Sequence, residues 1–224
     1  MPHQTIPYLK TEVIPQIPEL PSGKRILFLS DLHLGTPNVA KSTEREIKFC
    51  DFVRSEMYRT EAVVFLGDLF DCWMEIPAMM QQDFPHIIRL FSDLKQAGIP
   101  TYFFTGNHEI FMRNYLTKAF GIRVIRGEAT WQVGNTKLYL AHGHGLGPQE
   151  KFYRVFKNII ESDTLKFFFD LLPPKLGLFL ALKFAETRGV TDSFKMLEAK
   201  TINNHLFEFC QAIDSHKALQ AQYY

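Results

Sequence analysis

The stretch VVFLGDLFD, residues 63–71, places acidic side chains directly after a short apolar run. The apolar part has the length and β-branched composition of a buried strand, and Gly67 separates it from Asp68. Carboxylates at the edge of a core are costly unless they are paired or hold a metal. A single such stretch also fits an ordinary turn that contains aspartate, so a metal-binding interpretation requires that the pattern recur.

The same pattern recurs three more times along the chain. Apolar runs of strand length are followed directly by polar side chains: RILFLS (25–30) by DLHLG, PTYFFTG (100–106) by NHE, and TKLYLA (136–141) by HGHG. Segments with helical periodicity lie between the first three strand-like runs. This alternation predicts an α/β fold whose ligand site lies beyond the carboxyl ends of the strands. A Gly-Asn pair between TWQV and TKLYL predicts a hairpin, so the sheet is expected to be mixed.

Two helices are predicted between the first three strands. Thr43 and Glu46 have the spacing of a capping box, which places the start of the first helix near Thr43. Its predicted buried face consists of Ile47, Cys50, Val53 and Met57. The second helix carries Ile87, Phe91 and Leu94 on one face and ends at Gly98.

The polar side chains at the strand ends predict a metal centre. Asp31 and His33 are two residues apart, so on an extended chain they would point to the same side. The other strand ends contribute Asp68, Asn107, His108, His142 and His144. Carboxylate, imidazole and amide donors suit manganese, iron or zinc better than a soft thiolate site. Four such clusters in order favour a centre with two divalent ions, with manganese expected and iron or zinc as alternatives.

Composition and charge narrow the function classes. The 224 residues carry a formal net charge of +1, without the basic stripe that nucleic-acid binding would require, so no nucleic-acid partner is expected. The three cysteines are widely spaced and form neither a disulfide framework nor a zinc-ribbon spacing. The first residues lack the features of a signal peptide, and no apolar run approaches the roughly 18 residues of a spanning helix. We therefore expect a cytoplasmic protein.

A predicted helical segment over residues 147–190 goes beyond what a minimal core with such a metal site would need. Phe152 and Phe156 share a helical face, and Phe179 and Leu180 lie in a run without polar side chains at 176–182. This segment is either a helical hairpin packed on the core or a lid with an apolar groove for acyl chains or a membrane surface. Between residues 150 and 188, seven basic side chains against five acidic ones favour anionic headgroups weakly.

The predicted organisation has four parts. Residues 1–22 would form an extended N-terminal strap, because their scattered prolines disfavour a helix. The core spans residues 23–146, the lid 147–190, and residues 191–224 return to the core.

DLH, GDLFD, GNHE and HGH resemble the ordered signature of the calcineurin-like metallophosphoesterases over residues 25 to about 145. That resemblance implies a pair of mixed sheets sandwiched between helices, with two divalent ions where the strands end. It assigns the first ion to Asp31, His33 and Asp68. It assigns the second to Asn107 and His142, with Asp68 as the bridge.

The same resemblance implies the catalytic roles. His108 would lie beside the scissile phosphate and donate to an oxygen or to the leaving group, with Asn107 next to it. Asp31 would help to orient the nucleophile, and His144 would contact the phosphate. Asp71 would hold a ligand histidine or a loop rather than bind a metal directly.

Longer segments resemble the UDP-2,3-diacylglucosamine hydrolases of lipid A biosynthesis. They are SDLHLG, GDLFDCW, HGHGLGPQEKFYRVFKNII and LALKFAETRG. This resemblance implies cleavage of a pyrophosphate in an acylated UDP-sugar, with the insert covering the acyl chains through residues such as Phe152, Phe156, Phe179 and Leu180. It also implies peripheral contact with the inner membrane. That group usually has arginine where this chain has His108, and HGD in place of HGH.

Two alternatives stay open at this stage. The first is another enzyme of the superfamily that acts on a nucleotide or a phosphodiester without lipid. The second is a non-catalytic module at a membrane surface that keeps the fold.

The final family motif, G-H-x-H, does not occur in the sequence. After His144 the remaining histidines are His205 and His216, in other contexts. We expect that the chain ends before this motif, which would leave three protein ligands for each ion and a weakly loaded centre. A natural variant with fewer ligands is the alternative.

Overall fold

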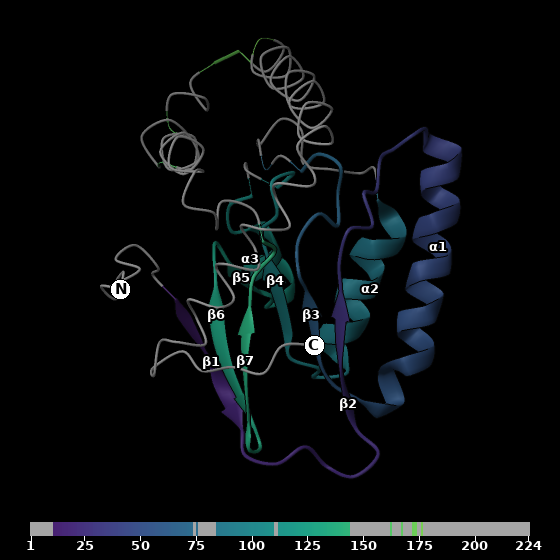
Figure 1. The fold of residues 1–224 in the computed structure, drawn as a ribbon. Coiled ribbons are helices and arrows are strands. Elements are labelled where there is room, and N and C mark those ends of the chain that lie inside the picture. Colours follow the sequence, from purple (N-terminus) through teal and green to yellow (C-terminus); the bar gives the residue numbers. More distant parts are fainter. Residues whose placement is uncertain are drawn as a thin grey trace, which may run out of the picture.

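The computed structural model describes residues 11–143, apart from Met74 and the segments 76–83 and 110–111, together with isolated positions between 162 and 176. Figure 1 shows the fold. In chain order the elements are β1 (Glu12–Ile17), β2 (Arg25–Leu29), α1 (Val39–Glu56), the 3-10 turn η1 (Met57–Arg59), β3 (Thr60–Phe65), α2 (Pro85–Gln96), β4 (Thr101–Phe104), α3 (Tyr115–Phe120), β5 (Arg123–Ile125), β6 (Ala129–Val133) and β7 (Thr136–Leu140).

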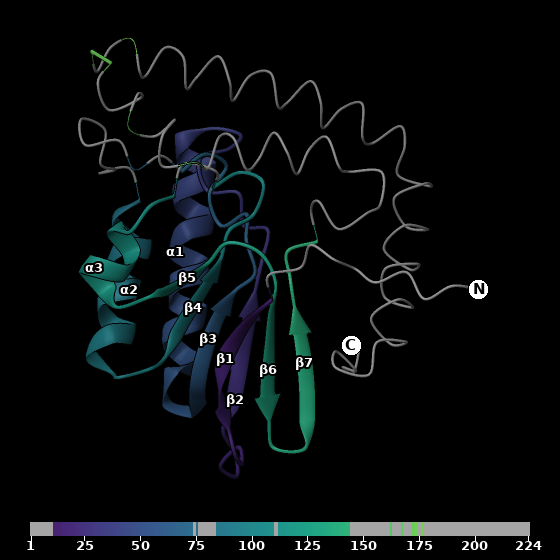
Figure 2. The ribbon, with the colours of Figure 1, turned by 90° about the vertical axis from the view of Figure 1, so that its left-hand side faces the viewer.

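The strands form two sheets. A four-stranded sheet has the order β2-β3-β4-β5 and is parallel throughout, and a three-stranded sheet has the order β1-β6-β7. In the smaller sheet β1 is parallel to β6, and β6 is antiparallel to β7 across the predicted Gly134-Asn135 turn. The helices lie on one side of the parallel sheet and the smaller sheet on the other (Figures 1 and 2). The predicted α/β fold is confirmed, and the mixed pairing belongs to the smaller sheet.

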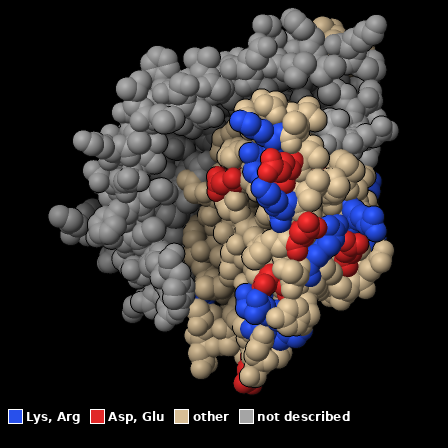
Figure 3. Space-filling model, turned by 90° about the vertical axis from the view of Figure 1, so that its right-hand side faces the viewer, with Lys and Arg blue, Asp and Glu red and all other residues tan. Residues whose placement is uncertain are grey.

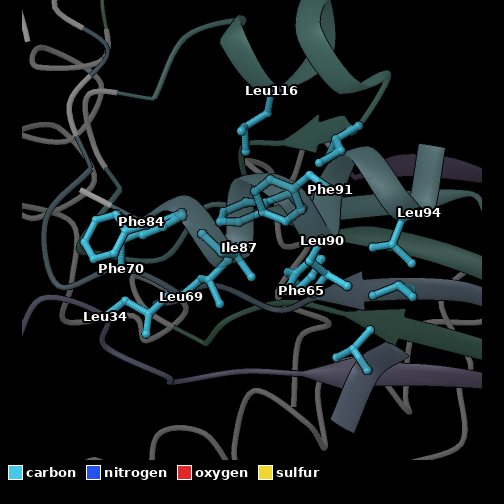
Figure 4. Close-up of a cluster of buried hydrophobic side chains, with 14 of the residues drawn as sticks. Leu34, Phe65, Leu69, Phe70, Phe84, Ile87, Leu90, Phe91, Leu94 and Leu116 are labelled. Atoms are coloured by element: carbon cyan, nitrogen blue, oxygen red, sulfur yellow. The ribbon is translucent and has the colours of Figure 1, made fainter. Parts of the chain in front are cut away.

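Strand β3 is buried on both faces, which explains its continuous apolar run. Val63 and Phe65 pack with the helices, whereas Ala62 and Val64 face the smaller sheet. Figure 4 shows Phe65 among Leu90, Phe91 and Leu94 of α2, and the Phe65 and Phe91 ring centroids are 5.5 Å apart. Because its side chains are fixed on both sides, the carboxyl end of β3 is held firmly in position.

A second core lies between the two sheets. Tyr102 and Phe104 of β4 pack there with Trp131 of β6, whose indole Nε1 donates to the carbonyl oxygen of Pro15 at 2.9 Å. Pro15 belongs to β1, which lies within the predicted N-terminal strap. This core attaches the β6–β7 hairpin to the parallel sheet, and β7 thereby reaches the same end of the molecule as β3 and β4 (Figure 2).

The predicted start of the first helix is wrong. α1 begins at Val39, and the Asn38 side chain accepts the N-terminal hydrogen bond from the backbone N–H of Lys41. Glu46 lies inside the helix, is 1% exposed, and accepts from the backbone N–H of Ile87 at 2.8 Å. Glu46 therefore caps α2 from a neighbouring helix, a contact between distant residues that a local spacing rule cannot detect. The predicted second helix, with Ile87, Phe91 and Leu94 buried, is confirmed.

Charges of both signs are interspersed on the face that carries α1 (Figure 3). Lys48 pairs with Glu44 at 2.6 Å, and Arg54 pairs with Asp93 of α2 at 2.8 Å. Among the described residues, no helix is both long enough and apolar enough to cross a membrane.

Candidate metal centre

The loops that leave β2 and β3 remain paired beyond the ends of the strands. The backbone N–H of His33 donates to the carbonyl oxygen of Asp68 at 3.0 Å, and that of Leu34 donates to Leu69 at 2.9 Å. Leu34 and Phe70 form an isolated parallel bridge. The residues after each strand are therefore fixed relative to one another rather than free to separate.

Three side chains of this region sit on left-handed backbone. Asp31, His33 and Asp68 have φ angles of 54°, 46° and 52°, and they are the non-glycine residues with positive φ in the described part of the chain. Such conformations cost free energy in L-residues and persist where the surroundings enforce them, often at functional sites. The extended-chain argument for Asp31 and His33 was therefore wrong, although the two side chains do converge, with Asp31 Oδ1 3.9 Å from His33 Nε2.

Two glycines allow the strand-end loops to come close together. A Cβ on Gly106 would lie 2.0 Å from Asp68 Oδ1 and 2.6 Å from the Asp68 backbone nitrogen. A Cβ on Gly67 would lie 2.7 Å from His142 Nδ1. Side chains at these positions would displace the very groups that could bind a metal, so both glycines are required by close packing.

Asp68 lies at the centre of the cluster. Its side chain is 5% exposed, and its Oδ2 is 3.2 Å from His142 Nε2 and 4.0 Å from His108 Nε2. Two groups of donor atoms converge within 4.8 Å: one contains His33, Asp68 and His108, and the other contains Asp31, Asp68 and His142. Asp68 is the donor common to both.

His142 arrives from the carboxyl end of β7 in the smaller sheet. Its Nδ1 is 2.8 Å from the carbonyl oxygen of Leu66, which can only accept, so Nδ1 carries the proton. Nε2 then faces Asp68 and Asn107, whose Oδ1 is 3.3 Å away. A histidine whose second nitrogen donates to a carbonyl is the usual arrangement of a metal ligand. The donor set and this orientation fit a divalent ion.

His108 has a similar anchor. Its Nδ1 donates to the carbonyl oxygen of Asp71 at 2.6 Å, and its ring meets the ring of His33 edge-on with centroids 4.9 Å apart. The Asp71 carboxylate Oδ1 lies 3.6 Å from His108 Nδ1 and 3.8 Å from His33 Nδ1. Asp71 therefore lies beside the Nδ1 atoms of both His108 and His33.

The buried carboxylates and imidazole have shifted pKa values. Burial raises the pKa of Asp68, but the hydrogen bond from His142 and the charges of His142 and His108 outweigh it and hold this pKa below its usual range. For His142, burial lowers the pKa, and the neighbouring Asp68 carboxylate more than compensates, so its pKa is raised. Burial, with the nearby charge of Asp68, raises the pKa of Glu109 to about 7.

Two residues that position the loops were not singled out from the sequence. Glu109, the last residue of GNHE, is fully buried and accepts hydrogen bonds from backbone N–H groups of both loops. Arg45 of α1 donates through Nη2 to the carbonyl oxygens of His33 and Thr36, both at 2.6 Å. The sequence signal for Glu109 was an acidic residue directly after His108 in the GNHE stretch. No sequence pattern pointed to Arg45.

The predicted substrate contacts cannot be placed. They fall outside the described residues, and they are His144, Phe152, Phe156, Phe179 and Leu180. Of the predicted lid at 147–190, the structure describes isolated positions between 162 and 176.

The sequence matches the family model of the calcineurin-like phosphoesterases over residues 24–205. The chain belongs to the calcineurin-like phosphoesterase family. Members of this family hold divalent metal ions, and the converging carboxylate and imidazole groups around Asp68 form a suitable donor set.

Several relatives of this chain carry the name UDP-2,3-diacylglucosamine hydrolase. One from Porphyromonas gingivalis is 30% identical over 139 residues, which cover 60% of this chain and 53% of the relative. One from Vibrio cholerae is 31% identical and covers 66% of this chain and 59% of the relative. One from Histophilus somni is 27% identical, and the match covers 83% of this chain and 77% of the relative. The match to the first of these thus spans about half of its length.

Replacing Gly106 by alanine tests the close approach of the loops. The added Cβ would collide with the Asp68 backbone, which cannot rotate away. We expect the free energy of unfolding to fall by about 1–3 kcal/mol, as for overpacked sites, together with reduced metal content. Urea denaturation and elemental analysis measure the two effects.

The matched control is Gly127→Ala, because a Cβ there meets nothing within 4 Å. This variant should retain both stability and metal. Equal behaviour of the two variants would contradict the packing argument.

Proposed function

We propose that this chain is a metal-dependent phosphoester hydrolase whose reaction takes place at Asp68. The observation that carries the proposal is the position of Asp68, a nearly buried carboxylate shared by two converging groups of donor atoms. Family membership supports the same reaction class.

In this proposal Asp31 and His33 would hold one divalent ion, Asn107 and His142 would hold the second, and Asp68 would contribute to both. The donor groups that converge in the structure are composed differently, because they join His33 with His108 and Asp31 with His142. Manganese is the proposed metal, with iron or zinc as alternatives. When bound, two such ions activate a water molecule and neutralise charge on the phosphate oxygens.

The protein's own groups then carry the proton and set the orientation. Asp71 accepts from Nδ1 of His108 through its carbonyl oxygen, which directs Nε2 of that ring toward the centre. In the protonated state His108 can donate from Nε2 to a phosphate oxygen or to the leaving group. Asp31, whose side chain is 60% exposed, is accessible to orient the attacking water.

The proposed substrate is UDP-2,3-diacylglucosamine, cleaved at the pyrophosphate to UMP and 2,3-diacylglucosamine 1-phosphate. The support is the shared name of the relatives and the predicted apolar lid at residues 147–190. Because this substrate carries two acyl chains, contact with the membrane surface through the lid is part of the proposal. The rival is a hydrolase of soluble nucleotides or phosphodiesters. It is favoured by His108, because the UDP-2,3-diacylglucosamine hydrolases usually have arginine at this position.

Two substrates separate these possibilities. The protein is assayed with manganese on UDP-2,3-diacylglucosamine in mixed micelles and on bis-p-nitrophenyl phosphate. We expect release of UMP that stops when EDTA removes the metal. Hydrolysis of the soluble ester alone would favour the rival, and a metal-loaded protein without turnover of either would favour a non-catalytic module.

Asp68→Ala tests whether this carboxylate is shared by two ions. Because both groups of donors contain Asp68, its removal should lower the metal content at both positions and abolish turnover. Elemental analysis of the purified protein provides the measurement. Asp51→Ala, which removes an exposed carboxylate on α1, is the control. Retention of one full equivalent of metal by Asp68→Ala would show that the two sites do not share this ligand.

His108→Ala separates proton donation from metal binding. Loss of a general acid typically lowers kcat by about 10²–10⁴-fold, and we expect this reduction with unchanged metal content. Replacing His86 of α2, which lies outside the donor groups, serves as the control. If His108→Ala loses metal instead, His108 is a ligand in the group with His33 and Asp68.

A further inference from the structure

Glu109 is a fully buried carboxylate whose hydrogen bonds all go to the loops of the metal centre. Its Oε2 accepts from the backbone N–H of Asp68 at 3.0 Å and of Gly106 at 2.8 Å. Its Oε1 accepts from the backbone N–H of Phe70 at 3.1 Å. The side chain itself has no solvent exposure.

These hydrogen bonds connect two loops that are distant in sequence. Asp68 and Phe70 follow β3, whereas Gly106 and Glu109 follow β4. One carboxylate therefore fixes both the backbone that carries Asp68 and the backbone that carries Asn107 and His108. It also supplies an acceptor to Asp68 in its left-handed conformation, which strand pairing cannot provide.

Other buried glutamates act differently in this fold. Glu46 accepts from Ile87 and Glu75 accepts from Tyr115, each in the first turn of a helix. Those contacts hold helix termini in place. Glu75 also accepts from the indole Nε1 of Trp73 in the segment after β3, but neither glutamate accepts from a backbone N–H beside a candidate ligand. Glu109 differs because all three of its donors lie in the loops that carry the candidate ligands.

The arrangement requires a carboxylate rather than an amide. A carboxyl group places an accepting oxygen at both positions, and when ionised it has about four acceptor positions and no donor, so it can receive three N–H groups at once. Glutamine keeps one oxygen and presents an NH₂ group where the other oxygen accepted. At least one buried N–H would then meet a donor and lose its partner, which disfavours the native loop geometry.

We propose that Glu109 is a positioning residue of the metal centre, which sets the geometry of Asp68, Asn107 and His108 through backbone hydrogen bonds without touching metal or substrate. The inference rests on the proposed function, because it assumes that these groups bind metal. Its effect should appear in metal affinity.

The first experiment compares manganese binding by the wild type, Glu109→Gln and Glu46→Gln. Loss of a group that orients metal ligands typically weakens affinity by about 10–100-fold, and we expect this loss for Glu109→Gln in a titration of free Mn²⁺ by electron paramagnetic resonance. Glu46→Gln also removes a buried charge, but its remaining oxygen can still accept from Ile87. It should therefore bind Mn²⁺ like the wild type. Equal affinity of Glu109→Gln and the wild type would overturn the proposal.

The second experiment uses the metal-free wild type. It therefore depends neither on metal binding nor on whether a variant folds. Amide hydrogen exchange of the metal-free wild type should show slow exchange at Asp68, Phe70 and Gly106, because each N–H is buried against the carboxylate. Exchange at the rate of exposed turns would contradict the proposed role. If the wild type binds none of Mn²⁺, Fe²⁺ and Zn²⁺ while these amides are protected, the proposed function fails and the loop-positioning role stands.

Discussion

A nearly buried carboxylate at the meeting point of four strand ends, those of β2, β3, β4 and β7, is the constraint around which this structure is arranged. Burial of Asp68 disfavours its charge, so the charge must be balanced by His142, by backbone N–H groups and by the cations that the centre is proposed to hold. That requirement brings β3, β4 and β7 close together and excludes side chains at Gly67 and Gly106. The non-glycine residues with left-handed backbone, Asp31, His33 and Asp68, lie at this same place in the described part of the chain.

The two cores provide the rigidity that this arrangement needs. β3 is packed by helices on one face and by the smaller sheet on the other, so its end cannot move without disturbing both. The smaller sheet delivers His142, and Trp131 fixes that sheet against the parallel one. The continuous apolar run of β3 therefore serves the site as well as the stability of the fold, because it determines where Asp68 is presented.

Much of the fold could be predicted because its signals are local. Strand-length apolar runs, the Gly-Asn turn and the face of α2 each depend on a few neighbouring residues. The predictions failed or were incomplete where distant residues meet. The spacing of Thr43 and Glu46 suggested a cap, but Glu46 serves α2 instead. Asp31 and His33 converge through left-handed backbone that no alternation rule describes, and Glu109 acts on residues about forty positions away.

His142 links the centre to the segment in which the predicted lid begins. It lies just beyond β7, at the end of the described core. Its Nδ1 hydrogen bond to Leu66 ties the imidazole to the end of β3, and Gly67 leaves room for the ring against that backbone. The orientation of Nε2 toward Asp68 is therefore set by residues of the described core. The donor groups around Asp68 are thus held by strand ends and loops of the core, and the chemistry of such a site depends on these particular side chains rather than on the fold as a whole.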